Sequence, residues 1–310
     1  MEKIICVAGP TASGKTKLSV ALAKALNGEV LSCDSMQIYL GMEIGTAAPT
    51  LEEMQGVPHH MIGVADPKED FSVGKYVEQA EPILQDILSR GKTCVVCGGT
   101  GLYADSLLLG RSFAPGPSTG VREQLEQEAA QNGIEPLLAR LRQVDPEAGE
   151  RLHPSDQRRI IRALEVYLET GETISEHNRK TKLLPPKHEA VWIGLTYENR
   201  QDLYDRIDLR VEKMLEAGLL DEIRALLASG VSPAATAMQA IGYKEYVDCL
   251  TSGGDASAAT ALVQQRSRNY AKRQLTWLRR NEKIHWILQP REPDFSAIFQ
   301  QARRNIPFFA

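Results

Sequence analysis

The 310-residue sequence has no apolar run close to the ~20 residues that a membrane-spanning helix requires. This excludes a protein that crosses the membrane on apolar helices, and we expect no membrane partner. The apolar residues after Met1 lead directly into a glycine-rich loop, so we interpret them as a core strand and not as a secretion signal. We therefore expect a cytoplasmic protein.

Cysteine is also scarce. The five cysteines are scattered through apolar segments, and their odd number argues against a disulfide framework. Cys94 and Cys97 have the CxxC spacing of redox and zinc sites, but the sequence has no second CxxC and no nearby His pair. In an extended strand these two side chains point to opposite faces. We interpret both as buried strand residues.

The sequence lacks internal repeats, low-complexity tracts and any excess of basic charge. Its net charge is −4, which does not exclude a nucleic-acid partner, because such binding depends on local patches more than on the total. The length suits one large domain with an insertion, or two modest domains.

Strands and helices alternate through the first hundred residues. Strands are expected at 3–8, 29–34 and 92–97, and helices at 15–27 and, after the N-cap Ser72, up to Arg90. The wholly apolar third strand suits a parallel sheet that is covered on both faces. We therefore predict a doubly wound α/β sheet, which two later strands at 191–197 and 284–288 extend.

The pattern changes at PGPSTG, residues 115–120, and stays helical as far as LLPPK, residues 183–187. Helices are expected at 121–132, 134–144 and 157–170, the last with Asp156 as its cap and Gly171 as its stop. Since Pro/Gly linkers flank this region, we predict an inserted all-helical domain at 115–189. The α/β core would then comprise 1–114 and 190–310.

The segment GPTASGKT matches a phosphate-binding loop, the P-loop. Its backbone N–H groups would cradle phosphate oxygens, with help from the N-terminus of the following helix. Lys15 would add positive charge, and the Thr16 hydroxyl would ligate Mg²⁺. The predicted phosphate-binding residues are Gly9, Pro10, Thr11, Ala12, Ser13, Gly14, Lys15 and Thr16.

The surroundings of this loop do not match a nucleoside triphosphatase. Such an enzyme would have a strand ending in an Asp that holds Mg²⁺, whereas the strand at 93–97 runs into Gly98-Gly99-Thr100-Gly101. The sequence also has no NKxD guanine-reading motif. Asp34 is the one suitably placed acidic residue. It could hold Mg²⁺ in a small-molecule kinase, act as a general base, or serve only as a turn residue.

Several segments together resemble the tRNA dimethylallyltransferases, also called tRNA isopentenyltransferases. They are GPTASGKT, DSMQIYLGMEIGTAAP, HHMIG, GGTGLY, DQRRIIRALEVY, YDRIDLRVEKMLEAGLLDE, AIGYKE and YAKRQLTWLRR, and they span the chain in order. No C-terminal zinc-finger pattern is present, as in the bacterial type. The resemblance implies a P-loop kinase-like fold. It also implies transfer of a dimethylallyl group from dimethylallyl diphosphate to the exocyclic amine of the adenosine 3′ of the tRNA anticodon, with release of diphosphate.

The resemblance also assigns roles to individual residues. The P-loop would hold the donor's diphosphate, with Mg²⁺ on Thr16, and Asp34 would accept a hydrogen bond or proton from the attacking amine. Thr100 would lie near the reaction centre, although local sequence alone favours a turn residue there. Catalytic roles are thus expected for Asp34, Thr100 and Arg210.

Arg210 lies on a predicted helix whose apolar stripe comprises Tyr204, Ile207, Val211, Met214 and Leu215. Helical periodicity places Arg210 at the edge of this stripe and Arg206 further toward solvent. By resemblance, Arg210 neutralises the leaving diphosphate. Local sequence alone favours surface salt bridges with Asp202, Asp205 or Glu212.

The predicted tRNA contacts also rest on the resemblance. They are Asp34, Ser35, Met36, Gln37, Thr100, Arg122, Arg158, Arg159, Arg162, Gly242, Tyr243 and Lys244. For Arg158 and Arg162, salt bridges with Glu165 and Glu169 are the alternative. The segment 266–283 carries seven Lys and Arg residues interleaved with Tyr270 and Trp277, which suits RNA phosphates and bases. Alternatively, it is an amphipathic helix whose aromatic residues belong to the core.

The sequence departs from the family pattern at Leu40 and Ala48, where we expect basic residues near the RNA entrance. Two other classes of function stay open at this stage. One is an ATP-dependent small-molecule P-loop kinase, and the other is a non-catalytic RNA-binding protein with a regulatory nucleotide site. The GGTG turn and the basic-aromatic helix favour the transferase, which we expect to be a monomer with the anticodon stem-loop as its partner.

Overall fold

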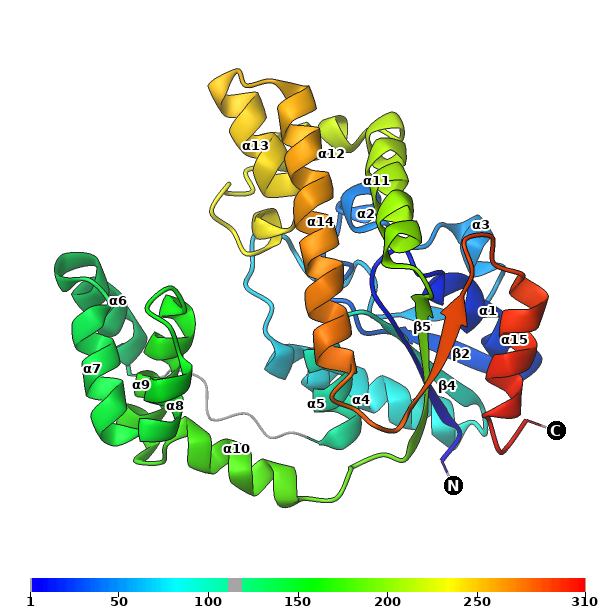
Figure 1. Ribbon diagram of the computed structural model, residues 1–310, viewed down its shortest axis with the longest axis horizontal. Coiled ribbons are helices and arrows are strands. Elements are labelled where there is room, and N and C mark those ends of the chain that lie inside the picture. Colours follow the sequence, from blue (N-terminus) through cyan, green and yellow to red (C-terminus); the bar gives the residue numbers. More distant parts are fainter. Residues whose placement is uncertain (1, 111–118, 310) are drawn as a thin grey trace. The chain divides into compact units, whose positions relative to one another are not determined.

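The computed structural model describes residues 2–110 and 119–309. The chain divides into two compact units (Figure 1). The first comprises Met1–Leu109 with Lys187–Ala310, and the second comprises Gly110–Pro186. Residues 115–118 of the predicted PGPSTG linker lie outside the described residues. None of the helices in the described residues is long and apolar enough to cross a membrane.

The first unit is built on a six-stranded parallel sheet in the order β3-β2-β4-β1-β5-β6. The β1 strand lies between two strands that are distant in sequence, with Ile4 opposite both Cys94 and Ala190. The strands are β1 (Ile4–Ala8), β2 (Gly28–Ser32), β3 (His59–His60), β4 (Thr93–Gly98), β5 (Ala190–Tyr197) and β6 (Ile284–Gln289).

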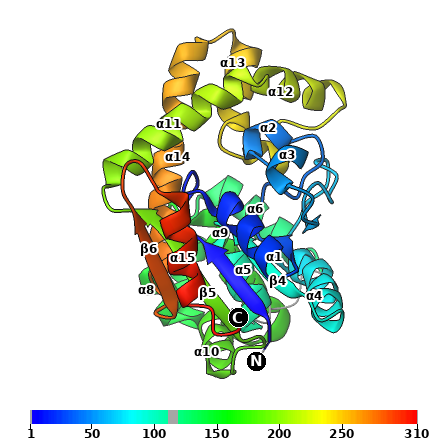
Figure 2. The same cartoon turned by 90° about the vertical axis from the view of Figure 1, so that its right-hand side faces the viewer.

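Helices cover both faces of this sheet, so the predicted doubly wound α/β fold is confirmed (Figure 2). Ile4, Cys6 and Ala8 point to the face covered by α4 (Val73–Ser89) and α5 (Gly101–Leu109). The alternate residues Ile5 and Val7 point to the face covered by α1 (Lys15–Ala25) and α15 (Phe295–Arg304). Every position of β1 is therefore apolar and buried, as a strand covered twice requires.

The two cysteines of the CxxC sequence lie on opposite faces of β4, as predicted. Cys94 belongs to the core with α4 and α5, whereas Cys97 packs against the core with α1. Both are free thiols. Burial raises the pKa of Cys94 to about 12, which disfavours the thiolate that redox or zinc chemistry needs.

A separate helical core lies within the first unit, formed by α11 (Arg200–Glu216), α12 (Leu219–Ala228), α13 (Tyr243–Ser252) and α14 (Ala256–Leu278) with the 3₁₀ turn η1 (Ala237–Gln239). It includes Ile38, Tyr39 and Met42 from the chain after β2. Two short helices follow that segment, α2 (Glu43–Thr46) and α3 (Leu51–Met54). The sequence did not predict them because four residues are too few to show a helical period.

The second unit contains only helices among its described elements: α6 (Val121–Asn132), α7 (Glu135–Val144), α8 (Pro146–Arg151), α9 (Gln157–Thr170) and α10 (Ile174–Leu183). Its core includes Leu125, Leu141 and Leu164. α9 has its predicted bounds and ends at Gly171. However, the Asp156 side chain does not cap it, because its oxygens accept hydrogen bonds from the His153 amide and from Arg159.

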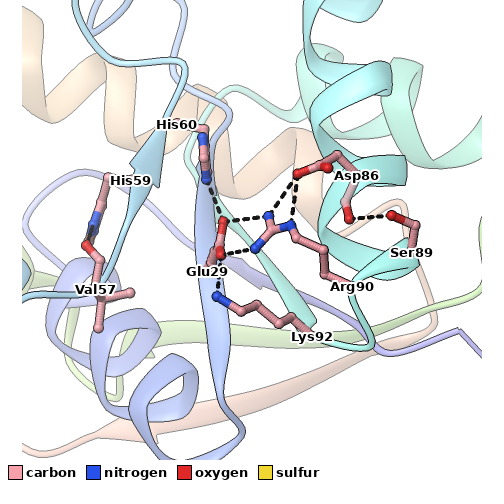
Figure 3. Close-up of polar contacts among 8 residues, drawn as sticks. All are labelled: Glu29, Val57, His59, His60, Asp86, Ser89, Arg90 and Lys92. Atoms are coloured by element: carbon pink, nitrogen blue, oxygen red, sulfur yellow. Dashed lines mark hydrogen bonds and ion pairs between the residues drawn. The ribbon is translucent and has the colours of Figure 1, made fainter.

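A buried carboxylate near the start of β2 joins this strand to its neighbours (Figure 3). Glu29 contacts His60 Nε2 at 2.8 Å, Arg90 Nη2 at 3.0 Å and Lys92 Nζ at 2.6 Å. These partners come from β3, from the end of α4 and from the start of β4. Hydrogen bonds from Arg90 hold the pKa of Glu29 well below its ordinary value, and those from Lys92 and His60 add to this effect.

Candidate active site

The P-loop connects the end of β1 to the start of α1. Gly9 passes so close to β5 that a Cβ atom there would lie 2.5 Å from the Leu195 carbonyl oxygen. Only glycine fits this approach. Ser13 is fully buried, and its hydroxyl has no hydrogen-bond partner in the described part of the chain.

Two buried glutamines fix the backbone of this loop. Gln274 of α14 accepts a hydrogen bond from the Thr11 amide at 2.9 Å and donates one to the Gly99 carbonyl at 3.0 Å. Gln289 of β6 donates to the Ser13 carbonyl at 2.9 Å. Gln274 thereby ties the P-loop to the GGTG turn. Sequence reasoning missed both glutamines because no local pattern links them to a loop more than 250 residues away.

A cavity of about 350 Å³ opens beside the P-loop. Thr11, Lys15 and Thr16 line it, together with the residues 34–37. Burial lowers the pKa of Lys15, whose Nζ donates to the Pro10 carbonyl at 2.7 Å. The helical core supplies an apolar part of the lining, to which Val211, Met214, Leu219, Ala240, Ile241 and Val263 contribute, and Ile207 of α11 adds to it.

Asp34 lies two residues beyond β2 and lines this cavity. Its Oδ1 accepts hydrogen bonds from the amides of Met36, at 2.9 Å, and Gln37, at 3.4 Å. The turn role that the sequence left open is therefore present. It occupies only one carboxylate oxygen, because Oδ2 has no hydrogen-bond partner among the described residues. That oxygen is available to a ligand.

Thr100 lies beside this turn without lining the cavity in the described structure. Its hydroxyl accepts a hydrogen bond from the Ser35 amide at 3.2 Å and lies 3.4 Å from the Ser35 hydroxyl. The GGTG turn is thereby joined to the DSMQ segment. Tyr270 of α14 is close by, and burial raises its pKa to about 12 while hydrogen bonding with Thr100 opposes this shift.

Arg210 projects from α11 into the same cavity. Its Nη2 donates to the Thr46 carbonyl at 3.4 Å, and its buried Nε has no partner among the described residues. Burial lowers its pKa, whereas the nearby charge of Asp34 acts in the opposite direction. The surface salt bridges that local sequence favours are absent for Arg210 in the described residues. Arg291, not Arg210, approaches Asp202 and Asp205.

Comparison with known families identifies the family to which this chain belongs. Residues 37–281 match the family model described as IPP transferase, and residues 2–63 match one described as isopentenyl transferase. The chain belongs to the IPP transferase family. The kinase alternative receives no support from these matches.

The alignments with curated relatives span nearly the full length of this chain and of each relative. The chain is 43% identical over 309 residues to a tRNA dimethylallyltransferase 1 of Pelobacter propionicus, covering 100% of this chain and 98% of the relative. It is 46% identical to a tRNA dimethylallyltransferase of Bacillus mycoides, covering 92% of this chain and 90% of the relative.

Solved structures agree with the fold. The tRNA isopentenylpyrophosphate transferase of Bacillus halodurans aligns with a TM-score of 0.73 and 41% identity, covering 97% of this chain and 94% of that protein. A eukaryotic dimethylallyltransferase acting on tRNA aligns with a TM-score of 0.83 and 30% identity, covering 98% of this chain and 77% of that protein. The IPP transferase fold is the P-loop kinase-like fold predicted from the sequence.

The residues of this IPP transferase with predicted tRNA contacts fall in several places. Ser35, Met36, Gln37 and Gly242 line the cavity, and Lys244 is exposed. Tyr243 is fully buried, and its hydroxyl donates to Glu222 at 2.6 Å. This side chain belongs to the helical core, and the contact of Tyr243 with tRNA stays a prediction.

The predicted tRNA-binding arginines of the second unit differ in their partners. Arg122 and Arg162 both pair with the buried Glu165, at 3.1 and 2.8 Å. The salt-bridge alternative is thus present for Arg162, whereas Arg158 is exposed and makes no such pair with a described residue. Arg159 pairs with Asp156 at 3.3 Å and is largely exposed.

The aromatic and basic residues of α14 differ in where they lie. Tyr270 lines the cavity, and Trp277 Nε1 donates to Asp105 at 2.9 Å, so the aromatic rings pack inward. The guanidinium groups of Arg273 and Arg280 lie over these rings, at 5.5 and 5.3 Å from the ring centroids. Tyr270 therefore belongs to the cavity and Trp277 is half-buried, while Arg273 lines the cavity at an exposed position and Arg280 is exposed.

Proposed function

We propose that this IPP transferase moves a dimethylallyl group from dimethylallyl diphosphate to the exocyclic amine of the adenosine 3′ of the anticodon in tRNA, releasing diphosphate. One observation carries the proposal: a single cavity is lined by the P-loop, by Asp34 and by Arg210, which has no carboxylate paired with it among the described residues. The names of the relatives, tRNA dimethylallyltransferases, support the same reaction.

The diphosphate of the donor fits the cationic part of the cavity. The P-loop backbone, Lys15 and the unpartnered Nε of Arg210 would bind its oxygens, as an anion relieves the cost of burying these charges. Mg²⁺ would be held by the Thr16 hydroxyl, which lines the cavity, with phosphate oxygens and water as its other ligands. When bound, the ion would neutralise charge on the diphosphate.

Asp34 is suited to receive the proton of the amine. The nitrogen's electron pair forms the new bond to the allylic carbon, the carbon–oxygen bond breaks, and the electron pair of that bond leaves with the diphosphate. The amine proton passes to Asp34 Oδ2, while the turn bonds to Oδ1 keep the carboxylate oriented. The exocyclic amine is a weak nucleophile, so an aligned carboxylate assists its attack.

The tRNA would reach this cavity with its target base extruded from the stack of the anticodon loop. Ser35, Met36, Gln37 and Gly242 line the cavity where such a base would enter. The exposed charges of Lys244, Arg158 and Arg159 would contact the RNA backbone. Arg122 and Arg162, which both pair with Glu165, would lie on the RNA-binding side of the second unit by the family resemblance. We expect the enzyme to act as a cytoplasmic monomer.

A transfer assay with a matched variant pair tests this function. The protein is incubated with unmodified tRNA, Mg²⁺ and labelled dimethylallyl diphosphate. Asp34→Asn keeps the turn acceptor but removes the carboxylate, and label transfer should fall about a hundredfold or more. Asp66→Asn is the control, because Asp66 makes a similar turn bond to the Lys68 amide at 2.8 Å on an exposed loop.

The assay also distinguishes the kinase alternative. Wild-type protein that never labels RNA, but moves the γ-phosphate of ATP to a small molecule, would overturn the proposed function. Equal losses in Asp34→Asn and Asp66→Asn would instead restrict Asp34 to its turn role.

A further inference from the structure

The short segment 43–47 contacts Glu222 on one side and Arg210 on the other, and its residues Gly45, Thr46 and Ala47 line the cavity. We propose that Glu222 is a positioning residue: its carboxylate fixes the segment 43–47 so that the Thr46 carbonyl holds the Arg210 guanidinium in the cavity. This inference rests on the proposed function, because it concerns the group that neutralises the leaving diphosphate. Glu222 itself does not line the cavity.

Glu222 uses both carboxylate oxygens on this segment. Its Oε2 accepts a hydrogen bond from the Ile44 amide at 2.7 Å, and its Oε1 accepts one from the Gly45 amide at 3.0 Å. The Tyr243 hydroxyl donates to Oε1 at 2.6 Å. Three donors therefore satisfy the negative charge, and it has no salt-bridge partner in the described residues. Hydrogen bonds to a charged acceptor are stronger than those to a neutral one.

Tyr243 of the helical core contacts both Glu222 and the segment 43–47. Its hydroxyl oxygen also lies 3.1 Å from the Met42 carbonyl oxygen, which accepts a hydrogen bond from the Thr46 hydroxyl at 2.6 Å. A Cβ atom on Gly45 would lie 2.5 Å from the Tyr243 ring. The glycine of the GTAAP motif is therefore required by the tyrosine packed against it.

On its other side, the segment 43–47 contacts two residues that line the cavity, Arg210 and Gln37. The Thr46 carbonyl accepts a hydrogen bond from Arg210 Nη2 at 3.4 Å, and the Ala47 carbonyl accepts one from Gln37 Nε2 at 3.1 Å. The bond to Thr46 is the only hydrogen bond that Arg210 makes with a described residue. Any movement of this carbonyl changes where the guanidinium lies, while the buried Nε offers no second anchor.

Glu222→Gln is a sharp test because it preserves the shape of the side chain. In glutamine an NH₂ donor replaces one of the two acceptor oxygens. Either the Ile44 amide or the Gly45 amide, which now donate to these oxygens, then loses its acceptor. The segment must then shift. Asp221→Asn is the matched control, since Asp221 neighbours Glu222 on α12 but is exposed and, among the described residues, pairs only with Arg224.

The measurement is kcat and KM for both substrates in the dimethylallyl transfer assay. We expect Glu222→Gln to lower kcat about tenfold to a hundredfold, with little change in the KM for tRNA, and Asp221→Asn to match wild type. In an Arg210→Lys background the same substitution should have a much smaller effect, because both changes disturb one interaction. Equal effects in the two backgrounds would reduce Glu222 to a general structural role and overturn the proposal.

Tyr243→Phe keeps the proposal testable if Glu222→Gln does not fold. It removes one donor to Oε1 and leaves both amide bonds, so kcat should fall about fivefold. Folded Tyr243→Phe with wild-type kcat would contradict the proposal. Failure of the proposed function is distinct, since wild-type protein would then transfer no label in the same assay.

Discussion

At the scale of single residues, Arg210 has unfavourable surroundings in the cavity. It carries a charge that burial disfavours, and its described partner is a backbone carbonyl at 3.4 Å. Burying a charge without a paired partner costs stability. Proteins retain such a charge where a bound ligand of opposite charge pairs with it. Arg210 should therefore lower the stability of the ligand-free protein, although the reaction requires it.

Arg210→Met tests this trade between stability and activity. The free energy of unfolding of the ligand-free protein should rise by about 1 kcal/mol, because an apolar side chain of similar length replaces a buried charge. The kcat for dimethylallyl transfer should fall about a hundredfold or more. Chemical denaturation and the transfer assay give the two values.

Arg206→Met is the control for that substitution. Arg206 is exposed on the same helix, 5.6 Å from the centroid of the Tyr197 ring, so neither the stability nor kcat should change comparably. A binding defect for tRNA in Arg210→Met, with kcat unchanged, would move Arg210 from the reaction to RNA contact.

Single residues differ in how far the sequence could predict them. Asp34, Arg210 and the P-loop lie in contiguous motifs, so their meeting in one cavity was expected. Glu222, Gln274 and Gln289 act on segments more than 170 residues away and through buried backbone groups. No local spacing encodes such contacts, since only the packing of the helical core and sheet brings the partners together.

At the scale of elements, Glu29 fixes a corner of the sheet. It links β2 to β3, to the end of α4 and to the start of β4 through His60, Arg90 and Lys92. β3 has only two residues and could not hold its place through backbone pairing alone. The charged contacts therefore stabilise the edge of the sheet where pairing is shortest.

This arrangement predicts a defined dependence of stability on pH. The Glu29 pKa is lower in the folded state than its ordinary value of 4.5, so its stabilisation is present above that pH and is lost as pH falls below it. Glu29→Gln should lower the free energy of unfolding at about pH 7 and flatten its decline toward about pH 3. Chemical denaturation across this range measures both.

Glu78→Gln on the exposed side of α4 serves as the comparison for Glu29→Gln and should follow wild type at each pH. A wild-type slope in Glu29→Gln would mean that other carboxyl groups account for the acid sensitivity.

Elements with a clear period were predicted within a few residues, whereas short ones were not. The strands β1, β4 and β5 and the helices α6 and α9 follow apolar patterns that packing preserves. α10 was missed, although Thr173 and Glu176 form a capping box that marks its start. α2 and β3 depend on Glu222 and Glu29 respectively, contacts that become apparent only once the fold is known.

At the scale of the whole molecule, the chain leaves and re-enters the first unit at adjacent points. The His188 amide donates to the Leu108 carbonyl at 2.9 Å. The buried His188 ring lies between Glu2, at 3.2 Å, and Glu81, at 3.0 Å. Contacts within the first unit thus hold the two ends of the interruption together.

Replacement of residues 110–186 by a short Gly/Ser linker should therefore leave the first unit folded. The separate cores of the two units share no cluster, so circular dichroism and a cooperative thermal transition should persist. Binding of inorganic diphosphate should also persist, measured by calorimetry, whereas tRNA binding should weaken. Loss of the cooperative transition would show that the first unit needs the insertion to fold.

The two glutamines that hold the P-loop also have a consequence for the order of folding during synthesis. The P-loop emerges from the ribosome more than 250 residues before Gln274 and Gln289, which fix its backbone. β1 likewise lacks one of its neighbours until Ala190–Tyr197 has been made. At about 5–20 residues per second, the loop would spend many seconds without its final conformation. Nascent chains would therefore bind phosphate only after Gln274 and Gln289 have been made.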